Sequence, residues 1–258
     1  DKRYWAFILQ GTHDGYRARY LFTCDAQTDQ VPGLYTLALN NSDIDWVGMS
    51  PLGNWVLVGG MDTNQGNLAG LVMADKTFSQ FHRLDFSTAH ADVGLDSEGR
   101  EVIVMQNVRT DYVDLIPIDL ATKPILESGG SYSGTNRVPM VRLYYSSDAN
   151  GFQSGVHISC NTPGYCVVST TTEAGTAGSN WLDRKIVLVT LDRTRPRAFY
   201  LARVFGSVSS YWEETHASIA RDGSSVVWAS NWNQNNGQEK VWLMKLDMPA
   251  QWQEQLGQ

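Results

Sequence analysis

The stretch Ala217–Asn231, ASIARDGSSVVWASN, contains the repeat that decides the fold. An apolar run, a polar turn with a glycine and a second, strongly apolar run are typical of an antiparallel β-hairpin. Three other stretches have the same form: DWVGMSPLGNWVLVGG (45–60), ADVGLDSEGREVIVMQN (91–107) and GVHISCNTPGYCVVST (155–170). A supersecondary unit that recurs in this way indicates a repeat architecture made of β-strands.

A third strand is expected after each hairpin, and an aspartate ends it every time. The N-terminal run RARYLFTCD ends in the same way, so the repeat is marked by Asp25, Asp75, Asp119, Asp192 and Asp247. These aspartates are 50, 44, 73 and 55 residues apart, which indicates one four-stranded blade per period and one insertion. The sequence therefore predicts an all-β chain, a β-propeller of four-stranded antiparallel blades with about five in view and the first incomplete.

The chain is expected to form a single propeller domain, or a segment of one, over residues 1–258. Its units are predicted at 1–40, 43–86, 90–128, 154–204 and 216–258, with an inserted loop at 129–153. Fourth strands are expected at Phe78–Phe86, Lys123–Ser128 and Pro196–Phe205, whereas the last unit has only QWQEQL (251–256) for this role. No innermost strand is visible for the first unit. We therefore expect a larger ring, completed by further blades or by another chain.

Blades packed on one another bury both faces of a sheet, which predicts a core from the strand sequences. The residues expected to be buried are Val47, Val56, Leu57, Val93, Ile103, Ile158, Val167, Ile219 and Val227.

Composition excludes some classes of function. The formal charge of −7 and the pI near 5.2 argue against a general nucleic-acid or anionic-membrane binder. No apolar run approaches the ~18 residues of a transmembrane helix. The N-terminal DKRYWAF has no signal-peptide pattern, so either a leader has been removed or the sequence is a piece of a longer chain.

Two of the three cysteines flank a turn. Cys160 and Cys166 lie on either side of NTPGY, where a disulfide across a short hairpin is geometrically feasible. The alternative is a pair of buried free thiols, with Cys24 a core residue in either case. A bridge would indicate an extracytoplasmic protein, periplasmic or secreted.

The hairpins DSEGREVIV and RDGSSVVWASN resemble the hairpin repeats of the TolB-type β-propellers. The entry HASIARDG (216–223) is similar to that of secreted propellers, including oligogalacturonate lyase-like ones. The resemblance implies the propeller fold, but transport, peptidase, lyase and scaffold proteins share this repeat. The lyases of this propeller family use a histidine-rich metal cluster, and the residues of that cluster do not map onto this sequence one by one.

Three histidines mark the entry of innermost strands. His90 and His216 precede such strands, His157 lies at the start of one, and Asp45 is near the same point of another unit. The propeller register predicts these side chains at the mouth of one funnel. Together they would bind a divalent metal whose identity is unknown, or one of the imidazoles would act as a general base. The alternative is a set of structural histidines, each hydrogen-bonded within its own blade.

Two long connections supply further candidates. The loop 129–153 contains Arg137, Arg142 and Tyr144, and the segment 206–215 contains Tyr211 and Trp212. Eliminative cleavage of a uronic-acid polymer needs a group that neutralises the carboxylate and a base that removes the C5 proton, and these residue types meet that need. Alternatively, VRLYY (141–145) is an extra edge strand and Tyr-Trp covers the core.

These observations predict a specific set of site residues. The predicted catalytic residues are His157, His216, Arg142, Tyr144 and Tyr211, and the predicted ligand-binding residues are His90, Asp45, Trp212 and Arg137. The predicted function is an extracytoplasmic propeller that binds, and in one version cleaves by β-elimination, an acidic saccharide at its funnel. The alternative is a non-catalytic scaffold that binds a partner protein there, and the sequence leaves open whether the chain is an enzyme.

Overall fold

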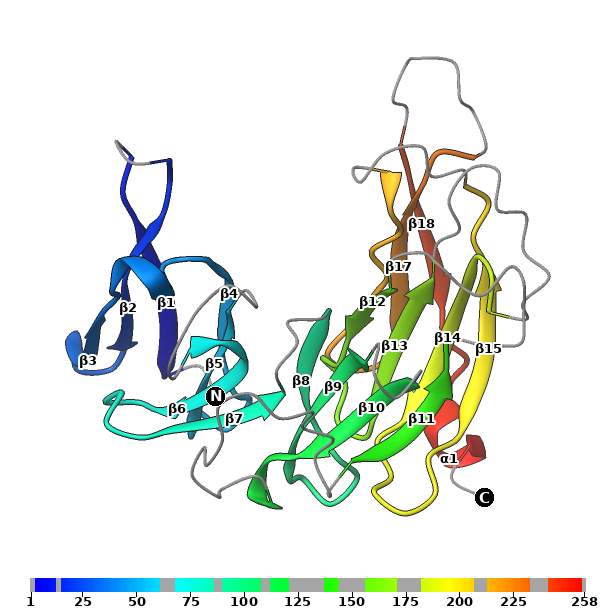
Figure 1. Ribbon diagram of the computed structural model, residues 1–258. Helices are drawn as coiled ribbons and strands as arrows, with labels where there is room; N and C mark the ends of the chain where they lie inside the picture. The colour runs from blue at the N-terminus through cyan, green and yellow to red at the C-terminus, as the bar shows by residue number, and fades with distance from the viewer. Residues whose placement is uncertain are drawn as a thin grey trace. The chain divides into compact units, whose positions relative to one another are not determined.

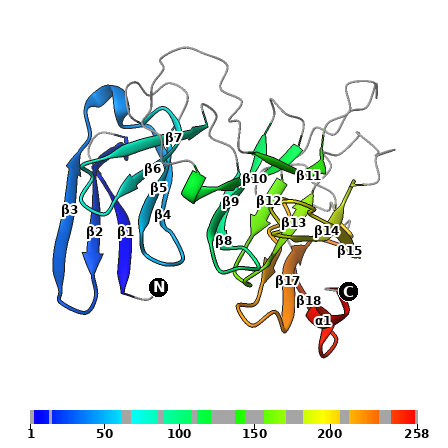
Figure 2. The same ribbon diagram turned by 90° about the horizontal axis from the view of Figure 1, so that it is seen from below.

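The computed structural model describes residues 3–12, 15–60, 68–85, 90–107, 112–120, 137–143, 156–170, 182–206, 213–232 and 241–256. These residues form antiparallel sheets and little else (Figure 1, Figure 2). The chain divides into two compact units, of which the first holds residues 1–89 and 116–137 and the second holds 90–115 and 138–258. Among the described residues, no helix has the length and apolar character needed to cross a membrane.

The first unit contains two sheets. One is three-stranded, in the order β1-β2-β3, with β1 (Tyr4–Gln10), β2 (Ala18–Asp25) and β3 (Gln30–Thr36). The other is four-stranded, in the order β4-β5-β6-β7, with β4 (Ile44–Met49), β5 (Trp55–Gly60), β6 (Gly70–Asp75) and β7 (Phe81–Asp85). A core that includes Leu21, Val56 and Val58 lies between them.

The second unit contains three sheets. The first consists of β8 (Ala91–Leu95), β9 (Glu101–Asn107), β10 (Tyr112–Pro117) and β11 (Val138–Arg142). The second consists of β12 (Val156–Ser159), β13 (Tyr165–Thr170), β14 (Lys185–Thr190) and β15 (Ala198–Arg203). The third consists of β16 (Ser218–Ile219), β17 (Ser225–Ser230) and β18 (Trp242–Asp247), followed by the helix α1 (Trp252–Leu256).

The sheet β12–β15 is covered on both faces, because alternate side chains of a strand point to opposite sides. Val168 and Val187 pack with residues of β8–β11, whereas Val167 and Leu188 pack with residues of β16–β18. Figure 2 shows this sheet between these two neighbours. Consecutive sheets within each unit thus stack face to face as the blades of a β-propeller do, which confirms the predicted fold class.

The backbone conformation of the turn explains why the hairpin sequence recurs. Gly53, Gly99 and Gly223 stand at equivalent places in their hairpins, Gly164 lies one residue closer to the next strand, and all four have φ between 70° and 82°. This left-handed region is open to glycine and strained for most other residues. The same glycine in each turn therefore explains why the four hairpin sequences look alike.

The predicted core is confirmed in part. Val56, Leu57, Ile103, Val167 and Ile219 are buried. Val47, Val93, Ile158 and Val227 are only partly buried, and the first three of these belong to the short strands β4, β8 and β12 at the sheet edges.

The structure differs from the predicted strands in two places. Lys123–Ser128 lies outside the described residues, and the fourth strand of its sheet is β11, which pairs with β10 from within the predicted inserted loop. The last unit has no fourth strand among its described residues, because Trp252–Leu256 is helical. Its Trp252 side chain is buried and donates its indole N–H to the carbonyl of Gly223.

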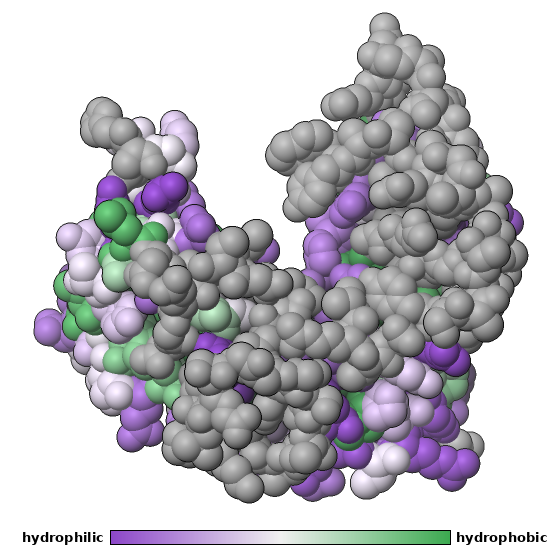
Figure 3. Space-filling view, in the orientation of Figure 1, coloured by the Kyte–Doolittle hydropathy of each residue, from purple (hydrophilic) through white to green (hydrophobic). Residues whose placement is uncertain are grey.

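One face of β1–β3 is apolar and exposed. Register and alternation place Trp5, Phe7, Leu9, Phe22 and Leu34 on this face, opposite the face that packs on β4–β7. The side chains of Trp5, Leu9 and Leu34 are 54%, 52% and 62% exposed. Hydrophobic patches are visible over this part of the first unit in Figure 3.

Candidate metal centre

The candidate site lies in the second unit, where three connections lead into innermost strands. His90 immediately precedes β8, and its carbonyl accepts the N–H of Gln106 at 2.8 Å. His157 is the second residue of β12, and His216 lies two residues before β16. Backbone hydrogen bonds within their own sheets therefore fix the positions of His90 and His157. His216 lies two residues before the first paired residue of β16.

The three imidazole rings lie side by side. The ring centroids of His157 and His216 are 3.5 Å apart with an interplanar angle of 30°, which is a stacked arrangement. The centroid of His90 is 4.6 Å from that of His157, with the rings nearly perpendicular. The rings thus contact one another across three consecutive sheets.

A carboxylate completes the cluster. Nε2 of His157 lies 2.7 Å from Oε2 of Glu214, and the two side chains are 10% and 15% exposed. Because an ionised carboxylate only accepts, the ring donates its Nε2–H and keeps the lone pair on Nδ1. In the metal-free protein this bond holds the His157 ring in one tautomer and one orientation.

Burial favours the neutral form of His157 and of His216. It lowers the pKa of His157 to about 3, and the neighbouring rings of His216 and His90 act in the same direction. Burial also lowers the pKa of His216; the Glu214 carboxylate opposes this and His90 adds to it. Neutral imidazoles have lone pairs that can bind a metal ion, whereas protonated ones do not.

The donor set fits a divalent transition metal. One ligand atom each from His157, Glu214 and His216 can be chosen so that all three lie within 4.8 Å of one another. Ligands at the ~2.0–2.1 Å bond lengths of zinc are separated by about 3.3 Å in a tetrahedral site, so two ligand atoms at the 4.8 Å limit would approach by about 1.5 Å on binding. Two imidazoles and one carboxylate suit zinc, manganese or iron.

Arg142, a predicted catalytic residue, does not join this cluster. Arg142 ends β11, on the far side of β9 and β10 from the strand β8 that follows His90. Three strand spacings amount to ~14 Å. Tyr144, Tyr211 and Trp212 lie outside the described residues.

Two predicted residues belong to the first unit. The guanidinium of Arg137 is buried and forms an ion pair with the buried carboxylate of Asp85. Asp45 is an exposed residue of β4, at the irregularity between the pairs Ile44–Gly60 and Trp46–Gly59. The structure therefore gives Arg137 a bonded partner within its own unit and does not place Asp45 relative to the histidines.

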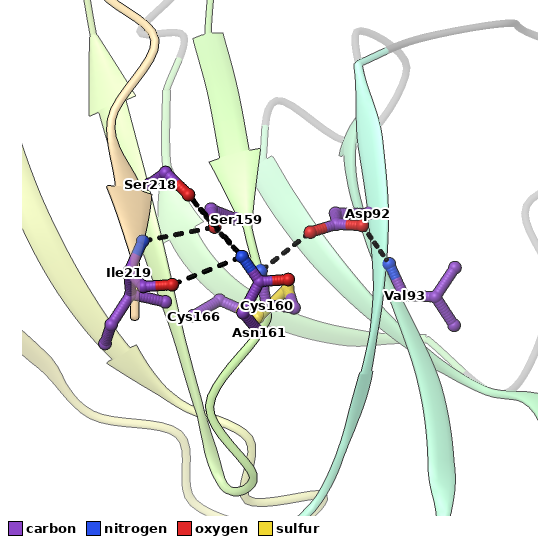
Figure 4. The surroundings of a disulfide bond; sticks show 8 residues. All are labelled: Asp92, Val93, Ser159, Cys160, Asn161, Cys166, Ser218 and Ile219. Carbon is purple, nitrogen blue, oxygen red and sulfur yellow. Dashed lines mark hydrogen bonds between the residues drawn. A yellow bond between two sulfur atoms is a disulfide. The ribbon is translucent and has the colours of Figure 1, made fainter. Parts of the chain in front are cut away.

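Cys160 and Cys166 are joined by a disulfide bond, and both are buried. The bridge closes the turn of the β12–β13 hairpin, the hairpin that carries His157. The N–H of Cys160 donates to the Asp92 carboxylate at 2.7 Å (Figure 4). Burial raises the pKa of Asp92, although its hydrogen bonds from Cys160 and Val93 oppose that shift.

Sequence reasoning missed Glu214 as a site residue. It is the second of two adjacent glutamates, and its place two residues before His216, a Glu-x-His spacing, was the local signal that could have found it. Its partner His157 is 57 positions away in the chain, so their contact depends on the stacking of two sheets.

The fold and the cluster define a propeller-blade protein with a histidine–carboxylate centre. No protein-family model matches the chain, and no curated protein matches it. Among solved structures, it is similar to TolB from Acinetobacter baumannii, with 14% identity over 94% of this chain, 48% of that chain and a TM-score of 0.48.

Two enzymes have comparable similarity. An oligogalacturonate lyase in complex with manganese is 10% identical over 90% of this chain and 54% of that one, with a TM-score of 0.48. The dihydro-heme d1 dehydrogenase NirN in complex with DHE is 12% identical over 95% and 41%, with a TM-score of 0.49. The chain thus spans about half the length of these structures. At such identities the likeness concerns the fold, and the site rests on its own geometry.

Proposed function

We propose that this chain is an extracytoplasmic propeller that binds a divalent metal ion at His157, Glu214 and His216, and with it the carboxylate of an acidic saccharide. The observation that carries the proposal is the 2.7 Å contact between Nε2 of His157 and Oε2 of Glu214, beside the stacked ring of His216. The disulfide Cys160–Cys166 supports the compartment, because such bridges persist in oxidising environments.

The charge of the metal-loaded centre, rather than that of the whole protein, favours an acidic ligand. The chain carries a formal charge of −7, so a polyanion is not attracted by the protein as a whole. A divalent ion on two neutral imidazoles and one carboxylate leaves a net charge of about +1 at the centre, which favours a carboxylate as the next ligand. When bound, the ion would neutralise a uronate carboxylate and so acidify the C5 proton next to it.

The remaining imidazole supplies the base for a cleavage reaction. His90 contacts the ring of His157 but is not one of the three grouped ligands. In a β-elimination, His90 accepts the C5 proton, the C5–H electron pair becomes the C4=C5 double bond, and the C4–O bond breaks. The leaving oxygen takes a proton from water, and the proton accepted by His90 neutralises the hydroxide that remains, so that the products are a new chain end and a 4,5-unsaturated uronide.

Metal titration tests the proposal directly. Isothermal titration of EDTA-treated protein with Mn²⁺ or Zn²⁺ should show one strong site, and Glu214→Gln should weaken it at least about tenfold. Glu98→Gln is the matched control, because Glu98 is exposed and pairs with Arg100. Wild-type protein that binds neither metal, or a Glu98→Gln variant that loses as much affinity, contradicts the proposal. Release of unsaturated uronide from polygalacturonate then distinguishes cleavage from binding.

The alternative function is a non-catalytic interaction module, and the exposed apolar face of β1–β3 favours it. Large exposed apolar patches commonly mark interaction sites. The occupant that fits this face is a further antiparallel sheet, because β12–β15 is apolar on both faces and has a sheet on each. In this case Phe7→Glu should abolish self-association measured by light scattering, and the His157 and Glu214 variants should leave it unchanged.

A further inference from the structure

A buried hydroxyl links the β12–β13 hairpin, which carries His157, to the segment before β16 that carries Glu214 and His216. Ser169 is on β13, directly opposite His157 in the β12–β13 register, and is fully buried. Its Oγ donates to the carbonyl of Thr215 at 2.9 Å and accepts the N–H of Ala217 at 3.1 Å. One hydroxyl therefore holds the peptide groups on both sides of His216.

This bond belongs to a series of polar contacts between two sheets that share no backbone pairing. Farther along β16, Oγ of Ser159 accepts the N–H of Ile219 at 3.3 Å, and the amide of Asn161 donates to the carbonyl of Ile219 at 3.2 Å (Figure 4). The hydroxyl of Thr162 donates to the carbonyl of Ala220 at 2.5 Å. Side chains of the β12–β13 hairpin thus set the register of the neighbouring segment 215–220.

Of these contacts, the one made by Ser169 lies at the metal ligands. Thr215 follows Glu214 directly, and the two backbone groups that Ser169 bonds enclose His216. A shift of this segment along β12 would change the separation of the His216 and Glu214 ligand atoms from those of His157. In the present register the three ligand atoms lie within 4.8 Å of one another, compared with the about 3.3 Å that a tetrahedral site needs.

We propose that Ser169 is a positioning residue that sets His216 and Glu214 against His157, and this inference rests on the proposed metal-binding function. Ser169 touches neither metal nor substrate. It acts through the backbone of Thr215 and Ala217, in the way that outer hydrogen bonds orient metal ligands.

The test compares two serines that make similar cross-sheet bonds. Ser169→Ala should weaken Mn²⁺ or Zn²⁺ binding about 10-fold or more in isothermal titration, because loss of such outer partners typically costs 10–100-fold. Ser159→Ala removes a bond to Ile219, farther from the ligands, and should leave the affinity within about twofold of the wild type. Ser169→Thr keeps the hydroxyl and should retain most of the affinity. Urea denaturation confirms that each variant is folded.

A second readout needs no metal. The stacked rings of His157 and His216 shift each other's proton resonances, so the imidazole signal of His216 should move in Ser169→Ala and stay in place in Ser159→Ala. If the wild type binds neither metal, the proposed function fails, and this resonance still decides the positioning role. The inference is overturned if Ser169→Ala keeps the wild-type resonance, or if it binds metal as tightly as the wild type. It is also overturned if Ser159→Ala causes equal losses.

Discussion

Removal of the Cys160–Cys166 bridge should lower stability by an amount that follows from its short loop. The cysteines are 6 positions apart in the chain. Loop-closure entropy for about six residues gives about 2 kcal/mol at 25 °C. For a protein of this size that corresponds to a fall in Tm of roughly 4–8 °C.

The assay is urea denaturation of oxidised and reduced protein. Both cysteines are buried, so the protein is reduced while unfolded and then refolded with reductant. Cys160→Ala with Cys166→Ala should lose more than reduction does, by about 1 kcal/mol for each buried sulfur removed. Cys24→Ser is the control, because Cys24 is a free cysteine of the other unit.

Two outcomes refute this reasoning. Equal midpoints for oxidised and reduced protein would show that the bridge does not constrain the unfolded chain. A native mass that does not lack two hydrogens under non-reducing conditions would show that the bridge does not form. Either result would also remove the support for an extracytoplasmic compartment.

Two further predictions concern a glycine and a histidine. A Cβ at Gly59 would lie 2.3 Å from Nε1 of Trp46, so Gly59→Ala should lower the free energy of unfolding by about 1–3 kcal/mol, measured by urea denaturation. Gly48→Ala is the control. The nearest atom to a Cβ there is 3.8 Å away, so this variant should not show the cost of a clash. Equal losses in the two variants would contradict the packing of Trp46. In metal-free protein, the pKa of His157 is about 3 in the folded state and about 6.5 in the unfolded state. Between pH 6.5 and pH 3 the unfolded state therefore binds one more proton than the folded state, so the free energy of unfolding falls as the pH falls. That fall is about 2 kcal/mol from pH 7 to pH 5 and should be absent from His157→Gln; the same pH dependence in both proteins would rule out a buried, neutral ring.

Much of the fold could be predicted because its signals are local. The hairpin turns require a glycine at positive φ, so Gly53, Gly99, Gly164 and Gly223 appear in the sequence at recurring places. Alternation of apolar residues then gives the flanking strands. Residues 251–256 were the only stretch left for a fourth strand, but Trp252 reaches the core from a helical turn instead.

The candidate site could be predicted only in part. His90, His157 and His216 were recognisable because each stands at the entry of an innermost strand, a position that the repeat defines. Glu214 was not predicted as a site residue, because its contact with His157 arises between two sheets. Arg142 was selected by residue type, and its distance from the histidines became visible only when β11 was found at the outer edge of its sheet.

A crystal soaked with Mn²⁺ or Zn²⁺ tests the central claim most directly. Anomalous diffraction should show one ion bonded to a ring nitrogen of His157, a ring nitrogen of His216 and a carboxylate oxygen of Glu214, at ligand distances of about 2.0–2.2 Å. The contradictory result is a structure with no anomalous peak at these residues, in which each imidazole is hydrogen-bonded within its own sheet.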